Sequence, residues 1–600
     1  MTRRKPLWVE IITLNWHLSP VRCVLIAALL LLGIASPLAT ALALKSLTDN
    51  ALAGAGGSAL AAAGVAAAAY ALGGLAFGVR DTLLMDVRDR VGHVLGERLL
   101  TATAATPTIA HLEDPEGLDR LDTAWRGGLH DVANIVWMVA QTVATVVSVA
   151  GSLLVLSAVS PMLLLTLPLA IPTVLLNQVG QRRLSCAREA AMEADRTAAN
   201  LLDNTFDPVW GAELRVTEAG SPLLDEYQRR WNEAIRIQQR ARWQAAALLA
   251  CGWLVFLAGF LGGVAWTVHE IVRGNGTAGD AILMMTVARQ QQDLVSGVVR
   301  GTRQVMQALH PYRAYAWLMD RIGEVKPVKD PQPVPERMAD GIVLEKVSFG
   351  YPGTGRKVLR QVDLELPAGS MVALVGAHGS GKTTLVKLLT QMYGPTAGRI
   401  TLDGHDLARF EPEEWRSRIT CAFQDFIKYE TTLGESIGIG DLSHVGDTER
   451  ITRALAHAGG EGLPAKLPDG LATKLGNLYE DGVQMSLGQW QKTALGRACM
   501  REAPVLMILD EPTASLDAPS EYEVFQRHVA LSRELGERYG TVTVVVSHRY
   551  STVRMADKIV VLRDGAILEE GPHDVLMKKT GGAYADMYRL QKEAYQQTAV

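Results

Sequence analysis

One glycine-rich segment combines residue types that can bind phosphate groups. It consists of Gly376, Ala377, His378, Gly379, Ser380, Gly381, Lys382, Thr383 and Thr384. Glycine at three of these positions allows a tight bend that brings backbone N–H groups against phosphate oxygens, where a Cβ atom would intrude. Lys382 can then reach the β- and γ-phosphates of a nucleotide, and the Thr383 hydroxyl can bind Mg²⁺. The G-x-x-x-x-G-K-[ST] pattern thus predicts a site for ATP and Mg²⁺.

The flanking residues predict the elements that must position this loop. The apolar run Met371–Val375 precedes the loop and indicates a buried strand, and residues 384–389 indicate a helix. A helix that begins at the loop turns the positive end of its dipole toward a bound anion. Strand, loop and helix in this order are the setting that the phosphate-binding pattern requires.

The chain is too long and too apolar to be one ordinary soluble domain. It has 600 residues, of which 48% are hydrophobic, and its mean hydropathy is +0.11. The formal net charge of −4 offers no basic surface of the kind that nucleic-acid binding requires. The five cysteines are scattered without C-x-x-C spacing, so we expect neither a disulfide framework nor a zinc site.

Apolar runs before residue 330 predict about six transmembrane helices. Five clear runs and a sixth, less apolar segment cover residues 24–44, 59–77, 135–156, 162–176, 246–268 and 281–305. Ahead of these runs, Trp8, Ile11, Ile12 and Trp16 indicate an amphipathic helix that lies at the membrane surface. The first half of the chain is therefore expected to contact the lipid bilayer.

The distribution of arginine predicts the orientation in the membrane. The loops at 79–134 and 178–245 are rich in arginine, whereas the loops on the other side hold little beyond Lys45 and Arg273. By the positive-inside rule, both termini and the phosphate-binding domain are cytoplasmic, as expected of a multi-pass protein of the inner (cytoplasmic) membrane. Apolar periodicity in both loops indicates that the membrane helices continue into the cytoplasm and turn back. The periodicity is broken near the two expected tips, at residues 113–118 and 210–216.

A proline-rich segment separates this membrane part from the second half of the chain. Residues 326–335 cannot continue a helix because proline recurs through them. After this segment, residues 342–349 alternate in polarity and predict a strand that ends at Tyr351. The predicted regions are an amphipathic helix (1–19), a transmembrane domain (20–325), a linker (326–340) and a nucleotide-binding domain (341–600).

Further motifs in the second half follow one another in a characteristic order. They are Tyr351, Gln424, the segment Met485-Ser486-Leu487-Gly488-Gln489, the strand 505–509 that leads into Asp510 and Glu511, then Asp517, and finally His548 after the strand 541–546. Together with the phosphate loop (residues 376–384), this order resembles that of ATP-binding cassette (ABC) transporters. The resemblance covers essentially the whole chain.

The resemblance implies a role for each motif. The implied catalytic residues are Glu511, which polarises the attacking water, Lys382, Gln424 and the switch histidine His548. The implied Mg²⁺ ligands are Thr383, Asp510 and Gln424. The implied ATP contacts are Tyr351 on the adenine, the phosphate loop, Asp517, and the signature residues Ser486, Gly488 and Gln489 of a second subunit. Such a set suffices because phosphoryl transfer requires mainly positioning and charge neutralisation.

The signature motif departs from the family pattern at one position. The usual first glycine of L-S-G-G-Q is Leu487 here. If that position needs a left-handed backbone, leucine costs about 1–2 kcal/mol. Alternatively, Ser486 and Gly488 make the contacts and Leu487 points away. A dimer is expected in either case; a homodimer is favoured, and a heterodimer with a second half-transporter is the alternative.

The resemblance implies a fold and a direction of transport. The expected fold is a multidomain membrane protein: a six-helix, all-α transmembrane domain with long cytoplasmic extensions, followed by an α/β P-loop ATPase domain with antiparallel β and helical subdomains. A membrane domain followed by an ATPase domain in one chain resembles an exporter half-transporter. The expected substrate is a peptide, natural product or drug-like molecule. Short segments such as 423–426 are similar to those of lantibiotic exporters. A lipid flippase and a membrane-anchored ATPase that does not transport are the alternatives.

The sixth apolar segment is the expected site of polar cavity residues. Arg289, Gln290 and Arg300 lie in it, together with the polar run 291–293. Lipid exposure would be costly for these side chains, so some of them should face a water-filled cavity or another helix. The alternative is that this stretch is already cytoplasmic and simply solvated.

Overall fold

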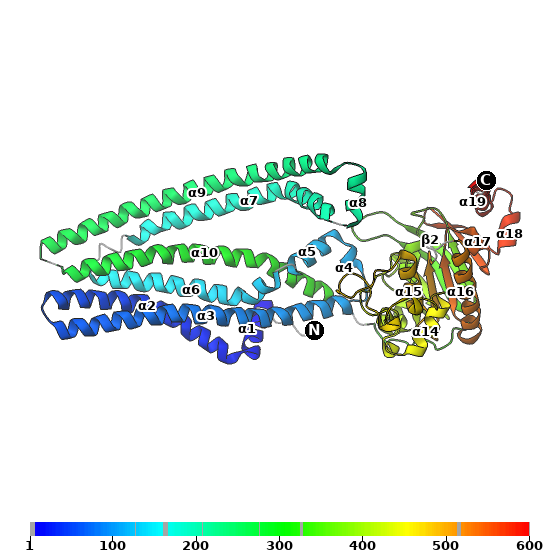
Figure 1. The fold of residues 1–600 in the computed structure, drawn as a ribbon, viewed down its shortest axis with the longest axis horizontal. Coiled ribbons are helices and arrows are strands. Elements are labelled where there is room, and N and C mark those ends of the chain that lie inside the picture. Colours follow the sequence, from blue (N-terminus) through cyan, green and yellow to red (C-terminus); the bar gives the residue numbers. More distant parts are fainter. Residues whose placement is uncertain are drawn as a thin grey trace. The chain divides into compact units, whose positions relative to one another are not determined.

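The protein divides into a helical unit and a unit that contains the β-sheets (Figure 1). The structure is a computed structural model that describes residues 6–125, 128–159, 166–206, 208–274, 276–323, 328–512 and 518–598. The helical unit comprises Met1–Thr101 and Arg120–Met319, and the sheet unit comprises Ala102–Asp119 and Asp320–Val600.

Long helices make up most of the helical unit. Those of more than 30 residues are α2 (Pro20–Leu52), α3 (Gly56–Ala105), α6 (Gly128–Val159), α7 (Thr166–Phe206), α9 (Gly220–Val272) and α10 (Ala278–Gly323). Within the described residues, four of them (α2, α3, α6 and α9) are long and apolar enough to cross a membrane, and α10 has a shorter apolar stretch at Ala278–Val287. Part of the apolar run predicted at 162–176 lies outside the described residues. The helical architecture is confirmed, whereas hydropathy supports four spans rather than about six.

Helix α1 (Leu7–Leu18) lies where the sequence predicts an amphipathic helix. The Trp137 indole donates a hydrogen bond to the side-chain oxygen of Asn15 at 3.0 Å, which holds α1 against α6. On its outer side, Trp8 is 55% and Trp16 is 53% exposed. Exposed tryptophans beside a buried anchor are what a helix at a membrane surface requires.

Short helices occur near both predicted hairpin tips. Helices α4 (Ala110–Glu113) and α5 (Pro115–Trp125) follow α3, and α8 (Pro208–Val216) lies between α7 and α9. The first tip is part of the sheet unit, which includes Ala102–Asp119. The second tip is part of the helical unit.

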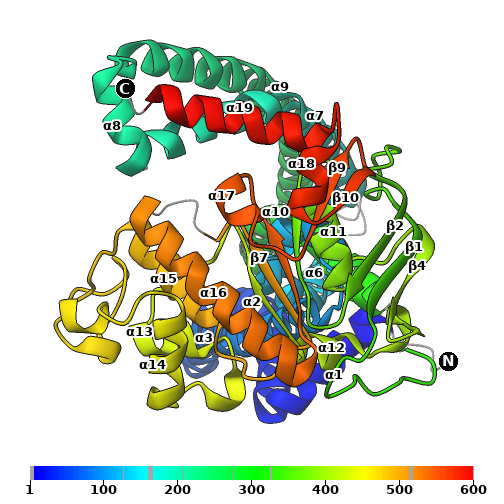
Figure 2. The same ribbon diagram turned by 90° about the vertical axis from the view of Figure 1, so that its right-hand side faces the viewer.

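The sheet unit contains two β-sheets, which Figure 2 shows beside the helices of the same unit. The strand order is β2-β1-β4-β5 in an antiparallel sheet and β10-β9-β3-β8-β7-β6 in a mainly parallel one. The strands are β1 (Gly341–Phe349), β2 (Leu359–Pro367), β3 (Met371–Val375), β4 (Ala397–Leu402), β5 (His405–Asp406), β6 (Ile419–Ala422), β7 (Leu506–Asp510), β8 (Val542–Val546), β9 (Lys558–Arg563) and β10 (Ala566–Gly571). The helices are α4 and α11 (Lys382–Leu389), α12 (Pro412–Ser417), α13 (Leu433–Gly438), α14 (Thr448–His457), α15 (Leu487–Ala498), α16 (Ala518–Tyr539), α17 (Tyr550–Val553), α18 (His573–Lys578) and α19 (Ala583–Thr598). The expected α/β domain with antiparallel β and helical parts is confirmed.

The parallel strands form the centre of the hydrophobic core. All residues of β3, β7 and β8 are buried, which is why these strands read as unbroken apolar runs. Successive side chains point to opposite faces of the sheet. Val372 and Leu374 therefore pack into a cluster with the antiparallel sheet, whereas Ala373 and Val375 pack into a second cluster that includes Phe525 of α16.

One strand prediction needs correction. Strand β1 ends at Phe349 rather than Tyr351, because Gly350 already belongs to the loop that closes when the Val358 N–H donates to the Phe349 carbonyl at 2.7 Å. Strand β2 then lies between Tyr351 and β3.

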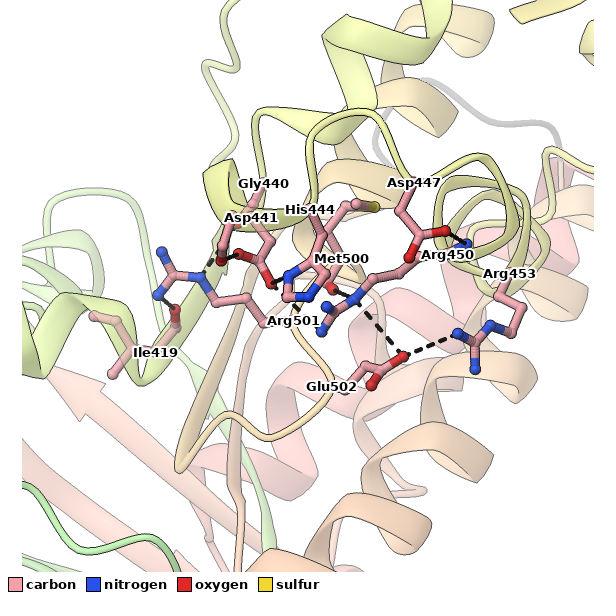
Figure 3. A network of polar contacts seen from close by, with 11 residues as sticks. Ile419, Gly440, Asp441, His444, Asp447, Arg450, Arg453, Met500, Arg501 and Glu502 are labelled. Carbon is pink, nitrogen blue, oxygen red and sulfur yellow. Dashed lines mark hydrogen bonds and ion pairs between the residues drawn. The ribbon is translucent and has the colours of Figure 1, made fainter.

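Arginine side chains hold the helical part of this unit in place (Figure 3). Nε of Arg501 donates to the Gly440 carbonyl at 3.2 Å and its Nη1 donates to the Ile419 carbonyl at 2.8 Å. Nε of Arg450 donates to the Met500 carbonyl at 2.9 Å. Since Met500 and Arg501 closely follow α15, these bonds tie the end of that helix to strand β6 and to helix α14.

We expect Arg501→Met to lower the thermal stability of the full chain. The substitution removes charge-assisted hydrogen bonds to three carbonyls, those of Gly440, Ile419 and Arg416, a loss of about 2–3 kcal/mol, or about 4–10 °C in Tm. Intrinsic fluorescence of the detergent-solubilised protein during heating measures the change. Arg453→Met is the matched control, because Arg453 and its partner Glu502 are 58% and 53% exposed and such pairs contribute little. Equal shifts in both variants would contradict the structural role of Arg501.

Candidate functional site

The carboxyl ends of four neighbouring parallel strands meet at one edge of the larger sheet. In the register, Leu374 lies opposite Val546, Val546 lies opposite Asp510, and Ala422 lies opposite Leu509. Because parallel strands end on the same side, the segments that follow β3, β8, β7 and β6 gather there. These segments carry the phosphate loop, His548, Glu511 and Gln424, respectively.

Backbone geometry explains the glycines of the phosphate loop. Gly376 has φ +153°, and a Cβ there would lie 2.3 Å from the Leu562 carbonyl oxygen. Gly381 has φ +107° and caps the N-terminus of α11, and a Cβ there would lie 2.7 Å from Leu359. The loop therefore keeps its backbone exposed at the start of a helix, where N–H groups and the helix dipole attract an anion.

Lys382 contributes a partly buried ammonium group at this loop. Its Nζ donates to the carbonyl oxygens of Gly376 at 2.8 Å and Ala377 at 3.0 Å. Burial lowers the pKa of this ammonium group, and the charges of Glu511 and Asp510 partly oppose the shift. The positive charge thus lies between the loop and two carboxylates.

Three hydroxyl groups of the loop have different environments. The Ser380 hydroxyl is buried and has no hydrogen-bond partner among the described residues. Thr383 is exposed, and Thr384 is buried with its hydroxyl 3.1 Å from the Tyr351 hydroxyl. A buried hydroxyl without a partner beside exposed N–H groups fits a ligand rich in oxygen atoms, such as a nucleoside triphosphate.

Asp510 and Glu511 are adjacent acids in different environments. Asp510 is only 3% exposed, and burial, followed by the charge of Glu511, raises the pKa of its carboxyl to about 6. Glu511 has φ +47°, an uncommon backbone conformation for a residue other than glycine, and its N–H donates to Val546 O at 2.9 Å. Such outliers occur where a structure over-determines the position of a functional side chain.

Two histidines lie beside Glu511. Nε2 of His548 is 2.9 Å from Oε1 of Glu511. The ring of His548 stacks on His378, with centroids 4.8 Å apart and planes at 4°. Burial and the nearby charge of Lys382 lower the pKa of His548. The sequence places His378 in the loop, but its contact with His548 was not predicted, because nothing in the local pattern marks a partner 170 residues away.

Tyr351 packs at the side of the phosphate loop. Its ring lies edge-on to Phe349 at 5.1 Å and to Tyr393 at 5.5 Å, and the Lys387 ammonium lies 5.3 Å from its centroid. The ring is only partly buried. Stacking on adenine therefore stays a prediction, whereas a contact with Thr384 of the loop is present.

Glu113, at the first hairpin tip, contacts the same group of residues. One of its carboxylate oxygens accepts a bond from Lys387 at 2.5 Å, and the other accepts from the Tyr393 hydroxyl at 2.6 Å. Burial alone would lower the pKa of Lys387, but the bond to Glu113 helps to raise it above its ordinary value. The tip thus lies one side chain away from Tyr351. Sequence analysis predicted the tip but not this partner.

The signature residues form the beginning of helix α15. Ser486 is the N-cap: its hydroxyl accepts from the Gln489 N–H at 3.3 Å, and the Gln489 side chain accepts from the Ser486 N–H at 2.8 Å. Leu487 is the first helical residue, is 52% exposed and does not have positive φ. The backbone cost considered for Leu487 therefore does not arise, because the helix needs no left-handed residue there.

The predicted site residues thus fall into separate groups. The structure brings together the phosphate loop, Asp510, Glu511 and His548. Gln424 is exposed just after β6, and Ser486, Gly488 and Gln489 lie at the start of α15; the contacts described for these residues do not join them to the phosphate loop. Asp517 lies outside the described residues.

Comparisons with known proteins agree with this geometry. The ABC transporter family model matches residues 359–514. The nisin transport ATP-binding protein NisT of Lactococcus lactis subsp. lactis is 39% identical over 233 residues, which are 39% of this chain and 38% of that protein. The ATP-dependent lipid A-core flippase of Ralstonia nicotianae is 40% identical over 258 residues, 43% of this chain and 42% of that protein. The chain thus matches about two fifths of the length of these relatives.

Two longer matches extend into the helical unit. The mitochondrial potassium channel ATP-binding subunit of Rattus norvegicus is 33% identical over 469 residues, which cover 76% of this chain and 62% of that protein. The structure of a bacterial Atm1-family ABC exporter with ATP bound has a TM-score of 0.78 at 24% identity, covering 96% of this chain and 98% of the other. Residues 359–514 therefore match the ABC transporter family, and the chain has the fold of that ABC exporter, in which a unit of long apolar helices is joined to a unit that contains the β-sheets.

Proposed function

We propose that this chain is an ATP-driven exporter that moves a peptide, natural product or drug-like molecule out of the cytoplasm by alternating access. The observation that carries the proposal is the meeting of Lys382, Asp510, Glu511 and His548 at one sheet edge of a chain that also has membrane-type helices. Phosphoryl transfer needs a cation, acids and a positioned water at one place, and these side chains can supply that arrangement.

Each of these side chains has a distinct task in the proposed reaction. Lys382 neutralises charge on the β- and γ-phosphates, and the loop N–H groups bind the phosphate oxygens. Glu511 accepts a hydrogen bond from the attacking water and orients it. His548, which contacts Glu511 in the structure, would touch the γ-phosphate. The position of Glu511 is fixed by its backbone bond to β8, so it needs little reorganisation.

Thr383, Asp510 and Gln424 are the proposed Mg²⁺ ligands. Within the described residues, no group of three or more His, Cys, Asp or Glu side chains could hold a metal ion alone. A threonine hydroxyl and one carboxylate are instead the set that binds Mg²⁺ when nucleotide phosphates complete its coordination. The ion would neutralise the charge that develops on the phosphates. Binding would also favour the ionised form of Asp510, whose pKa is raised.

The complete site is proposed to form between two subunits. Ser486 and Gly488 would offer a hydroxyl and an N–H to the γ-phosphate held by the partner subunit, with Gln489 capping the same turn and Asp517 nearby. The ordinary helical backbone of Leu487 favours a homodimer, because the substitution does not distort the turn. A heterodimer with a second half-transporter is the alternative.

The helices and the arginine-rich loops support the proposed placement in the cell. Both termini and the ATPase domain would be cytoplasmic, and the protein would cross the inner membrane several times. The proposed regions remain 1–19, 20–325, 326–340 and 341–600. Closure of two ATPase domains on ATP, followed by reopening after hydrolysis, would drive the change of access.

Glu113 is the proposed link between nucleotide binding and the helices. It bridges Lys387 and Tyr393, and both of these side chains contact Tyr351 beside the phosphate loop. A displacement of the loop on binding ATP would therefore reach the first hairpin tip through contacts that already exist.

A lipid flippase of the same architecture is the second candidate. Its support is the similarity of part of the chain, 43% of its length, to lipid A-core flippases. A partial match of this kind does not identify the transported molecule.

Glu511→Gln should lower ATP turnover by about 10²- to 10⁴-fold, because the amide cannot act as a base toward water. Phosphate release from the purified chain in lipid measures turnover, and binding of a fluorescent ATP analogue shows that the site persists. Glu537→Gln removes one acid of the same domain away from the sheet edge and should have little effect. Full turnover in Glu511→Gln would show that the assignment of the base is wrong.

Binding of Mg²⁺ should weaken as the pH falls through about 6, the raised pKa of Asp510. A protonated carboxyl cannot coordinate the ion, so the apparent Kd for Mg²⁺ in the presence of ATP should rise about tenfold between pH 7 and pH 5. Asp510→Asn should bind Mg²⁺ weakly and lose this dependence, apart from the part that comes from protonation of ATP itself. An unchanged pH slope in the variant would contradict the role of Asp510.

Glu113→Gln should uncouple transport from ATP turnover. The amide loses charge-assisted bonds to Lys387 and Tyr393 but leaves the catalytic residues in place. We expect basal turnover to persist and stimulation by any active compound, in a panel of peptides, drugs and lipids, to fall by about fivefold or more. Asp114→Asn makes the same change of charge one residue away and serves as the control. If both variants are stimulated like the unmodified chain, Glu113 is not the link.

A further inference from the structure

The helical unit contains a cavity of about 510 Å³ between α2, α3, α6 and α10. These helices run alongside one another in Figure 1. The volume lies in the range of small-molecule binding sites. Two arginines, Arg80 and Arg300, and two glutamines, Gln141 and Gln290, lie among its lining residues, and none of the described lining residues is acidic.

Three of these four side chains have buried polar atoms without a hydrogen-bond partner among the described residues. The atoms are Nε of Arg80, Oε1 of Gln141 and Oε1 of Gln290. The amide nitrogen of Gln290 donates to the Pro37 carbonyl at 3.1 Å, so the side chain is held in place while its oxygen stays without a donor. Unpaired polar atoms are rare in buried sites and costly within a membrane domain, which points to a ligand that pairs with them.

Neighbouring hydroxyl groups do not satisfy the glutamine oxygens. Ser36 Oγ donates to the Ala69 carbonyl at 2.7 Å, Thr40 Oγ1 donates to the Ser36 carbonyl at 2.9 Å, and Thr145 Oγ1 donates to the Gln141 carbonyl at 2.8 Å. Each of these three donors is used by the helix backbone. A molecule in the cavity can supply the donors that the glutamine oxygens lack.

The chemistry of the four side chains defines such a molecule. A guanidinium group in a low-dielectric site calls for an anion and matches the geometry of a carboxylate. A glutamine oxygen accepts from an N–H group, as a peptide backbone supplies. We propose that this cavity binds an acidic segment of a peptide substrate, with its carboxylate at Arg80 and Arg300 and its N–H groups at Gln141 and Gln290.

This assignment rests on the proposed export function and narrows its substrate to an anionic peptide. Water could pair with the glutamine oxygens but would not balance two guanidinium charges. The phosphate of a lipid head group would also balance those charges, but its own oxygens are acceptors at physiological pH, so the donors for the glutamine oxygens would have to come from another part of the head group. A carboxylate with N–H groups beside it satisfies both kinds of side chain.

Arg289 provides a matched control. It lies on α10 like Arg300 and carries the same charge, but it does not belong to the described lining of the cavity. Of the polar residues predicted for the sixth segment, the cavity thus includes Gln290 and Arg300, whereas the side chains of residues 291–293 lie outside the described ones.

The test measures peptide binding without nucleotide, on the full chain in phosphatidylcholine nanodiscs. The probe is a tetrapeptide of alternating glycine and glutamate, and its comparison is the glutamine analogue with an amidated C-terminus. Calorimetry should show about tenfold tighter binding of the acidic peptide, as expected from one charge-assisted contact. Arg80→Gln and Arg300→Gln should each remove this preference, and Arg289→Gln should keep it. Gln141→Leu should weaken both peptides equally.

Three outcomes would overturn the proposal. They are equal binding of the two peptides, equal loss of preference in Arg289→Gln, and competition by phosphatidylglycerol with the same dependence on Arg80 and Arg300. The last outcome would identify an anionic lipid as the occupant. If Arg80→Gln does not fold, Arg300→Gln carries the same test, because Arg300 is exposed. Binding needs no ATP, so failure of ATP-driven vesicle uptake with the peptide preference intact would count against export and not against this site.

Discussion

The common register of β3, β8, β7 and β6 is the constraint on which the candidate site depends. Each of these strands is only four or five residues long, and each is followed at once by one functional segment. A shift of one residue in any strand would exchange its two buried faces and also move its catalytic side chain along the sheet edge. Packing on both faces of the sheet therefore determines where the candidate site residues lie. The two apolar clusters that hold the strands in register also hold Lys382, Glu511 and His548 within reach of one ligand.

Charge at that edge is balanced by neighbours rather than by solvent. Asp510 is buried next to Glu511, which raises its pKa, while Lys382 opposes the shift with a positive charge. Glu511 in turn contacts His548, whose ring rests on His378. The ammonium group of Lys382 is hydrogen-bonded to two carbonyls of the phosphate loop and feels the charges of both acids. Binding of a nucleotide with Mg²⁺ would exchange these partners, so the same few side chains would rearrange for the proposed reaction.

Sequence patterns predicted the features that depend on local chemistry. The phosphate loop and the strands β3, β7 and β8 follow from glycine spacing and from apolar runs buried on both faces. Contacts across long sequence separations, such as His378 on His548 or Glu113 on Lys387 and Tyr393, have no local signature and were not predicted. Of the two alternatives considered for Leu487, the structure disfavours strain for a related reason: comparison with a motif gives residue types, whereas the N-cap at Ser486 decides the backbone conformation. Within the described residues, hydropathy supports four of the long helices as spans, and the polar residues of α10 shorten its apolar stretch.

The polar residues that line the cavity also bear on the free energy of the proposed transport. A cavity lined by the partly buried guanidinium of Arg80 and by unpaired amide oxygens is unfavourable in a membrane domain, and the proposed anionic peptide would relieve that state on binding. Release on the other side of the membrane then requires the helices to rearrange so that the cavity no longer fits the peptide. Such a rearrangement needs an external source of free energy. In the proposed mechanism, ATP binding at the sheet edge supplies that free energy through a mechanical connection. The carboxylate of Glu113, with one oxygen on each of two side chains beside the phosphate loop, suits this proposed role because its bonds are short, charged and directional.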